Sequence, residues 1–174
     1  MIKIGQKLPD TEVLWVRESE VKKITLSQKL AGRKVAIFGM PGAFSATCSG
    51  LHLPNIIGNK DELLEKGIEE ICILTVNDPF VLSEWGRSKG ILKEEITLIG
   101  DATSESTKKV GLNFSALSIG VYNRSLCYAM LAEDGEVKHF ILEATKSRIT
   151  TSGANARIEA ISGSSTWTFC LCNP

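Results

Sequence analysis

The sequence predicts an α/β fold in which helices flank a mixed central β-sheet. Short apolar runs at 34–38, 70–76 and 96–100 are rich in β-branched residues and bounded by turn residues, which is typical of buried strands. Segments with helical periodicity separate these runs, and such alternation is the pattern of an α/β domain. At 174 residues, the chain is long enough for one domain with a substantial core.

The first of these strands, 34–38, is followed by a predicted helix in the second half of 49–67. This segment ends in the string KDELLEKG, whose apolar residues have helical spacing. Pro54 should kink or break the helix, because proline lacks the backbone N–H and clashes with the preceding turn. Gly67 should end it, since glycine readily adopts the left-handed conformation of a helix C-terminus.

A second helix is predicted over 79–90, after the strand at 70–76. Pro79 suits a first helical position, and either Asn77 or Asp78 suits the N-cap before it. Gly90 is the expected C-terminal stop.

The last part of the chain predicts a short helix over 104–111 and then a hairpin over 127–142. Asp134-Gly135 is the expected turn of this hairpin, since this dipeptide favours the tight turns that join antiparallel strands. A closing amphipathic helix is expected over 153–161. The predicted domain covers 1–161, and 162–174 forms a C-terminal tail to which the sequence assigns no role.

Composition and charge disfavour several classes of protein. Lysine plus arginine equals aspartate plus glutamate, at 20 each, so no basic stripe points to a nucleic-acid partner. No stretch approaches the roughly 20 apolar residues of a membrane span. The start, MIKIGQKLPDTEV, lacks the pattern of a signal peptide. We therefore expect a cytoplasmic protein with no nucleic-acid and no membrane partner.

The cysteine pattern argues against both a disulfide framework and a metal site. An odd number of cysteines at irregular spacing is untypical of secreted, disulfide-rich domains. The five cysteines are Cys48, Cys72, Cys127, Cys170 and Cys172. His52 and His139 have no partner at a metal-ligand spacing. No C-x-x-C pair is present, which disfavours a disulfide reductase.

Cys48 is the candidate catalytic residue. It follows the loop that leaves the strand at 34–38 and should lie near the first turn of the next helix, where ligands of open α/β sheets gather. Backbone N–H groups at a helix start favour an anion, here the thiolate. Ser45 precedes it by three residues and can hydrogen-bond the sulfur or its substrate, while Pro41 would fix the loop. The alternative is a buried cysteine packed as a small apolar residue.

The string PGAFSATCSGLHLP (41–54) resembles the active-site loop of the type V (plant type II) peroxiredoxins. It fits the signature Pro-x-x-x-Thr/Ser-x-x-Cys, and TVNDPFVLSEWGRSKG (75–90) and RSLCYAMLAEDGEVK (124–138) match further motifs in register. The resemblance covers about residues 1–161. It implies a thioredoxin-like fold and reduction of hydrogen peroxide or alkyl hydroperoxides by a cysteine thiolate, with no metal or organic cofactor.

The resemblance also implies a role for each matching residue. Cys48 would attack the peroxide and become a sulfenic acid. Ser45 would orient the peroxide, and Pro41 would shield the sulfur from water. Backbone N–H groups around 46–48 would stabilise the charge that develops as the O–O bond breaks.

One position departs from the family pattern. The family carries an arginine directly before the aromatic residue of the third motif, whereas this chain has Cys127 before Tyr128. Arg124 lies three residues earlier, and in a regular strand an odd offset points to the opposite face. Only a bulge would redirect Arg124 toward the thiolate. Loss of a charge-assisted partner is expected to cost about ten- to a hundred-fold in rate.

The remaining cysteines bear on how a sulfenic acid would be reduced. Cys72 and Cys127 are both possible resolving cysteines, although Cys72 is more simply explained as a buried strand residue. The family implies an external reductant, either glutathione with glutaredoxin or thioredoxin, and a homodimer packed through the active-site loops near Phe44. The alternative to an enzyme is a redox-sensing or interaction protein on the same fold, with an active site weakened at Cys127.

Overall fold

A seven-stranded mixed sheet forms the centre of the computed structural model, which describes residues 1–17 and 20–142. The strands lie in the order β2-β1-β5-β4-β3-β8-β9. β3, β4 and β5 run parallel, whereas β1 and β8 run antiparallel to β5 and β3. The bounds are β1 Glu12–Arg17, β2 Glu20–Thr25, β3 Lys34–Met40, β4 Glu70–Thr75, β5 Thr97–Gly100, β8 Tyr128–Glu133 and β9 Glu136–Leu142. The predicted mixed sheet and its three predicted strands are confirmed, and the structure shows that these three run parallel.

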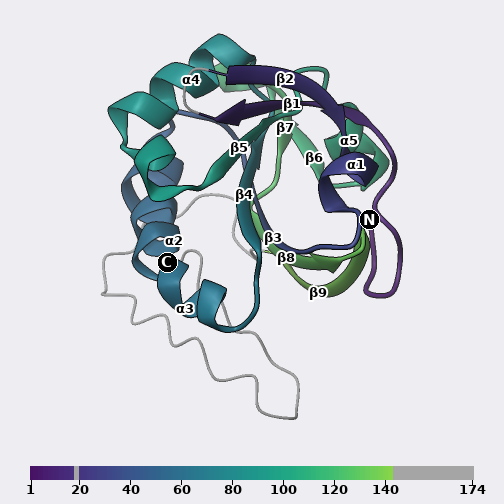
Figure 1. The fold of residues 1–174 in the computed structure, drawn as a ribbon. Helices are drawn as coiled ribbons and strands as arrows, with labels where there is room; N and C mark the ends of the chain where they lie inside the picture. Colours follow the sequence, from purple (N-terminus) through teal and green to yellow (C-terminus); the bar gives the residue numbers. More distant parts are fainter. Residues whose placement is uncertain (18–19, 143–174) are drawn as a thin grey trace.

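Helices cover both faces of this sheet (Figure 1). The helices α2, α3 and α4 lie on one side, and α1 and α5 lie on the other. Their bounds are α1 Leu26–Leu30, α2 Leu53–Gly58, α3 Lys60–Glu65, α4 Pro79–Ser88 and α5 Glu105–Lys109. Among the described residues, no helix is long and apolar enough to cross a membrane. The predicted closing helix and the tail lie outside the described residues.

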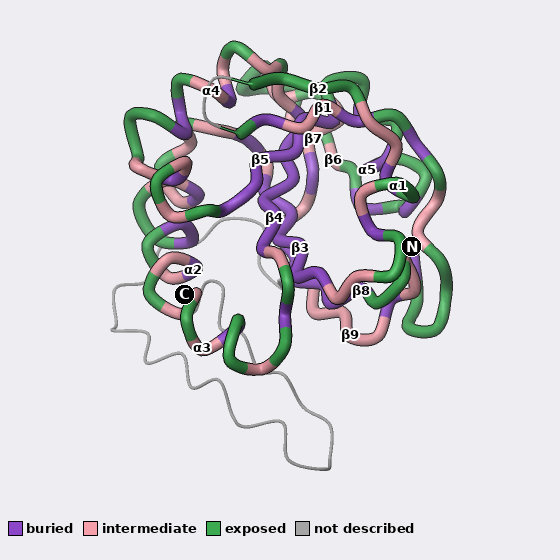
Figure 2. The backbone as a smooth tube through the Cα atoms, in the orientation of Figure 1, coloured by how far each residue is buried: buried purple, intermediate pink, exposed green. Residues whose placement is uncertain are grey.

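Two apolar clusters fill the space between the sheet and its helices. Along β4, Ile71 and Ile73 belong to the cluster beneath α2, α3 and α4, while Cys72 and Leu74 belong to the cluster on the other face. This alternation follows from the two-residue period of a strand. The central strands are buried on both faces (Figure 2), which explains why their sequences read as continuous apolar runs.

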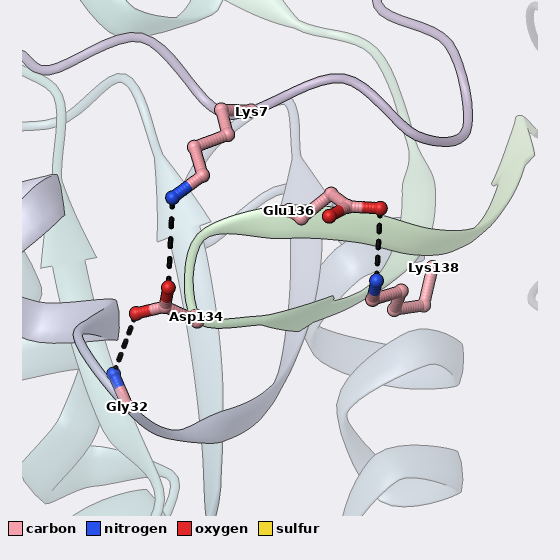
Figure 3. A network of polar contacts seen from close by, with 5 residues as sticks. All are labelled: Lys7, Gly32, Asp134, Glu136 and Lys138. Carbon is pink, nitrogen blue, oxygen red and sulfur yellow. Dashed lines mark hydrogen bonds and ion pairs between the residues drawn. The ribbon is translucent and has the colours of Figure 1, made fainter.

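The β8–β9 hairpin turns at Asp134-Gly135, as predicted. Both residues have positive φ, 48° and 73°, the conformation that a two-residue hairpin turn of this type requires. The Asp134 carboxylate also accepts a hydrogen bond from the Gly32 N–H at 2.8 Å and lies 3.5 Å from Lys7 Nζ (Figure 3). The turn is thereby tied to the segment that leads into β3.

The N-cap of α4 is Asp78, which was one of two candidates. Its carboxylate accepts hydrogen bonds from the N–H groups of Phe80 and Val81 at 2.9 and 3.0 Å, satisfying donors that the first turn leaves open. Pro79 is the first residue of the helix, and Gly90 follows its end with φ of 72°. Asn77 is thus free for another role, described below.

Several elements were not predicted. The β1–β2 hairpin carries little apolar periodicity because β2 is an exposed edge strand with four exposed residues in sequence. A small second sheet pairs β6 (Asn113–Ala116) with β7 (Val121–Ser125). These strands are short and only partly buried, so the pattern that reveals central strands is absent.

Gly39 is required by the packing of β3 against β8. A Cβ atom at this position would lie 2.0 Å from Cε1 of its cross-strand partner Tyr128, whose ring is buried. We expect Gly39→Ala to lower the free energy of unfolding by about 2–3 kcal/mol, as for other overpacked cores. Urea unfolding measures the loss. Gly58→Ala is the control, since its Cβ would meet no atom within 4 Å; equal stability of the two variants would contradict this packing argument.

Candidate active site

Cys48 lies where the chain passes from β3 into the helices on one face of the sheet. Residues 41–45 form the loop after β3, and the helical segment that leads to α2 begins at Ala46, so Cys48 lies in its first turn. Its side chain is only 1% exposed and belongs to the apolar cluster beneath α2 and α4. The thiol therefore sits at the carboxyl edge of the parallel strands, as predicted, and in an environment largely closed to water.

Pro54 determines the shape of the turn that carries Cys48. In an α-helix its ring would clash with the carbonyl of Gly50, four residues earlier. The backbone is wider there: Cys48–His52 form a π-helical turn in which the N–H of Leu53 donates to the carbonyl of Cys48. The expected break is thus a change of helix type, with Pro54 in the first turn of α2. Such π-helical turns are frequent at functional sites.

The loop before Cys48 is held by Asn77, which follows β4. The Asn77 side chain accepts a hydrogen bond from the Ala43 N–H at 2.9 Å. Phe44 then has φ of 61°, a strained conformation for a residue with a side chain, at a cost of about 1–2 kcal/mol. Strain of this kind persists where the surroundings fix the backbone, and it clusters at functional sites.

The helical segment is fixed from the other side by α4. The Ser49 N–H donates to the Ser45 carbonyl at 2.9 Å, and the Ser49 hydroxyl accepts a hydrogen bond from the Trp85 indole at 2.9 Å. Trp85 is fully buried in α4. The residues on both sides of Cys48 are therefore anchored, which keeps the thiol in a constant position.

Three side chains converge at this point: Cys48, His52 and Cys127. Their sulfur and nitrogen atoms all lie within 4.8 Å of one another. Cys127 Sγ is 3.8 Å from His52 Nδ1. Cys48 and His52 are buried, whereas Cys127 is half-buried in the short connection between β7 and β8. Spacing along the sequence pointed to no partner for His52, but the structure brings it together with Cys48, one helical turn earlier, and with Cys127, from a distant part of the chain.

The pKa of the Cys48 thiol is lowered to about 4, mainly by a hydrogen bond from Cys127. Burial opposes this by disfavouring the thiolate, whereas His52, the nearby Ser45 hydroxyl and the Gly42 N–H lower the pKa further. No lysine or arginine is among these leading causes. The lowered pKa favours the thiolate form of Cys48 at neutral pH.

Ser45 lies near the sulfur as the sequence predicts, and the structure adds the Gly42 N–H, which was not predicted. The Ser45 hydroxyl is buried and makes no hydrogen bond of normal geometry among the described residues, so it acts on Cys48 as a nearby dipole. It is therefore available to a substrate oxygen. Pro41, directly after β3, is half-buried and opens the loop.

Arg124 reaches the edge of this loop by a route that regular strand geometry does not allow. The β6–β7 pairing shifts register between Phe114 and Ala116, and Asn123 has φ of 45°. The bulge that would be needed to redirect Arg124 is therefore present in β7, which ends at Ser125. The guanidinium donates to the Val76 carbonyl. A Cβ at Gly42 would lie 3.4 Å from Arg124 Nη1, so the guanidinium lies against the loop that precedes Cys48.

The structure does not bring Cys72 to the site. Cys72 is fully buried in β4 and packs in the cluster on the other face of the sheet from Cys48. Burial raises the pKa of the Cys72 thiol well above its usual range, and the nearby Glu70 carboxylate adds to this. A thiol in this state is a poor nucleophile. Cys170 and Cys172 lie outside the described residues.

Sequence reasoning missed the roles of His52 and Asn77. The four-residue spacing from Cys48 to His52 signals a shared helix face, but only if Cys48 is known to be helical. Asn77 was weighed only as an N-cap. Its contact with Ala43 depends on two strand ends lying side by side, and the pairing of β3 with β4 establishes this.

The lowered pKa predicts an unusual pH dependence for alkylation of Cys48. A lowered thiol pKa keeps the reactive thiolate present until the pH falls through the pKa of Cys48 in the folded protein. Between about pH 6 and pH 8 we expect a nearly constant rate with iodoacetamide, whereas an ordinary thiol would gain roughly 80-fold. Peptide mapping isolates Cys48 from the other thiols. Cys127→Ala removes the main donor and should restore a steep rise; a flat profile in this variant would contradict the assigned cause.

Fold and site together define a thiol-dependent oxidoreductase on a thioredoxin-like fold. The Redoxin family matches residues 3–158. Peroxiredoxin-2E-2, chloroplastic, from Oryza sativa subsp. japonica is 38% identical over 164 residues, which cover 92% of this chain and 72% of that protein. Peroxiredoxin-2C from Arabidopsis thaliana is 34% identical over 92% of this chain and 98% of its own length.

Solved structures agree with this assignment. The crystal structure of reduced Prx3 from Vibrio vulnificus in complex with hydrogen peroxide has a TM-score of 0.78 at 36% identity. It covers 86% of this chain and 92% of its own. The chain therefore belongs to the Redoxin family and, within it, to the peroxiredoxins, which are thiol-dependent peroxidases.

Proposed function

We propose that this chain reduces hydrogen peroxide and alkyl hydroperoxides with the Cys48 thiolate. The observation that carries this proposal is a buried thiol whose pKa is lowered by the polar groups around it, which come from the loop, the helical turn and the β7–β8 connection. The sulfur attacks the terminal peroxide oxygen and the O–O bond breaks. Cys48 becomes a sulfenic acid, and the leaving alkoxide or hydroxide takes a proton to form an alcohol or water.

The donors around Cys48 suit this step. The buried Ser45 hydroxyl and the Gly42 N–H both lie close enough to the sulfur to stabilise negative charge on it. As the S–O bond forms, charge moves from sulfur to the leaving oxygen, and fixed donors of this kind follow it without reorganisation. Arg124 acts on the same loop indirectly: it donates to the carbonyl of Val76, the neighbour of Asn77, whose side chain holds Ala43. We assign it a positioning role.

For recycling we propose Cys127 as the resolving cysteine. Its sulfur lies within 4.8 Å of Cys48 Sγ, so only a small local movement is needed to reach a disulfide bond length. The Cys127 thiol attacks the Cys48 sulfenic acid, the S–O bond breaks and water leaves. An external dithiol, thioredoxin or glutathione with glutaredoxin, then reduces the disulfide.

This assignment predicts a specific product after one turnover. Reduced protein treated with one equivalent of hydrogen peroxide should yield a Cys48–Cys127 disulfide, identified by non-reducing peptide mapping. The Cys72→Ala variant should give the same product, because Cys72 lies on the other face of the sheet. A stable sulfenic acid at Cys48, or a disulfide of Cys48 with another cysteine, would contradict the role of Cys127. Coupled assays with each reductant identify the physiological one.

A second candidate function is that of a redox sensor. The observation that favours it is Cys127 itself, which stands where the family pattern has an arginine, so that no arginine is among the groups that lower the pKa of Cys48. In a sensor, the Cys48–Cys127 disulfide would be the signal. Slow peroxide reduction with a long-lived disulfide would favour this function over the peroxidase.

We also propose a homodimer that packs through the loops beside the active site. Phe44 is 53% exposed next to Cys48, and Phe80, at the start of α4, is 84% exposed. The Ala43–Asn77 hydrogen bond ties the two segments together. A second copy of the chain would bury these side chains. Light scattering of the wild-type protein and of a Phe80→Asp variant tests this, since the substitution should favour the monomer.

A further inference from the structure

The Cys48, His52 and Cys127 cluster offers two sulfur donors and one imidazole nitrogen. All three donor atoms lie within 4.8 Å of one another, and the Cys127 Sγ to His52 Nδ1 distance is 3.8 Å. Around a tetrahedral Zn²⁺, sulfur and nitrogen ligands lie roughly 3.5–3.8 Å apart. Inward movement of at most about 1 Å would therefore bring all three donors to one ion.

The chemistry of the donor set is that of zinc. Thiolate and imidazole are the ligands that Zn²⁺ prefers, and three protein ligands leave one tetrahedral position for water or another small ligand. Two thiolates and a neutral imidazole exactly balance the charge of the ion, so a bound ion would leave no net charge in this largely buried site. Cys127 is half-buried, which gives the ion a route from solvent.

We propose that Cys48, His52 and Cys127 form a Zn²⁺ site that competes with peroxide for the Cys48 sulfur. The ion takes the electron pair that would otherwise attack the peroxide. Zinc and peroxide therefore exclude one another at Cys48. The site depends on the proposed catalytic residue for a ligand but not on turnover, so binding and catalysis are tested separately.

Titration of the reduced, metal-free full chain with Zn²⁺ by calorimetry tests the proposal. We expect one equivalent to bind, and Co²⁺ in its place to show the thiolate charge-transfer band and the visible spectrum of a tetrahedral site. Cys127→Ala and His52→Ala should each weaken Zn²⁺ binding about 100-fold or more. Loss of a group that only hydrogen-bonds a metal ligand already lowers metal affinity about 10- to 100-fold, and loss of the ligand itself should cost at least as much. Cys127→Ser is a second variant at the same position, and urea unfolding confirms that each variant is folded.

Two control variants keep the three ligands. Cys72→Ala removes a thiol on the other face of the sheet, and a double Cys170→Ser, Cys172→Ser variant removes the two remaining thiols; both should bind zinc as the wild type does. Absence of stoichiometric binding, binding unaffected by loss of Cys127, or binding lost with Cys170 and Cys172 would each overturn the proposal. Zinc binding without peroxidase activity would instead contradict the proposed function and leave the metal site standing.

Discussion

Replacing Cys48 with serine is expected to lower kcat/KM for hydrogen peroxide by at least about 1,000-fold, as loss of a catalytic nucleophile does in other enzymes. A serine hydroxyl does not ionise in this range, so the groups that lower the pKa of Cys48 cannot convert serine into a comparable nucleophile. The measurement is peroxide consumption coupled to reduction by thioredoxin or by glutathione and glutaredoxin.

The matched control for this prediction is Cys72→Ala. It also removes one buried thiol, but from the opposite face of the sheet. We expect its activity to stay within about two-fold of wild type, as is usual for a change remote from the chemistry. Similar losses in the two variants would mean that Cys48 has no special role.

Replacing Cys127 with arginine is expected to raise the rate of peroxide reduction by about ten- to a hundred-fold. The substitution places a guanidinium beside a thiolate whose leading stabilising groups include no lysine or arginine. A guanidinium also offers several donors to the peroxide oxygens, and such charge-assisted hydrogen bonds strengthen as negative charge moves to the leaving oxygen. A stopped-flow measurement of the first turnover separates this step from recycling.

Cys127→Gln is the control for the arginine variant. It adds a long polar side chain without a charge, so it should give little of the expected gain. Both variants lose the proposed resolving thiol, and in both the Cys48 sulfenic acid should persist. If the arginine variant reduces peroxide no faster than the wild type, the groups already around Cys48 activate it fully and the prediction is contradicted.

The parts of the fold that the sequence predicted well are those with strong local signals. The strands β3, β4 and β5 are buried on both faces and read as apolar runs, and the turn at Asp134-Gly135 and the N-cap at Asp78 depend on local backbone chemistry. The edge strand β2 lacks such signals because it is largely exposed, and the β6–β7 pair lacks them because it is short and only partly buried.

The sequence predicted those residues of the site that lie within one local motif. Cys48, Ser45 and Pro41 lie within eight residues of one another, so their spacing alone brings them together. The approach of Cys127 to His52 joins residues 75 positions apart, and no local pattern encodes it. The path of Arg124 depends on a register shift and a positive φ at Asn123, neither of which the residue types near it require.

The central claim is that Cys48 is the residue that peroxide oxidises. The most direct test uses a Cys127→Ser variant, in which the proposed disulfide cannot form and a sulfenic acid can be trapped. One equivalent of hydrogen peroxide is added to the reduced variant with dimedone, and the labelled peptides are mapped. The account predicts rapid consumption with the label on Cys48. Slow consumption, or a label spread over Cys72, Cys170 and Cys172, would contradict it.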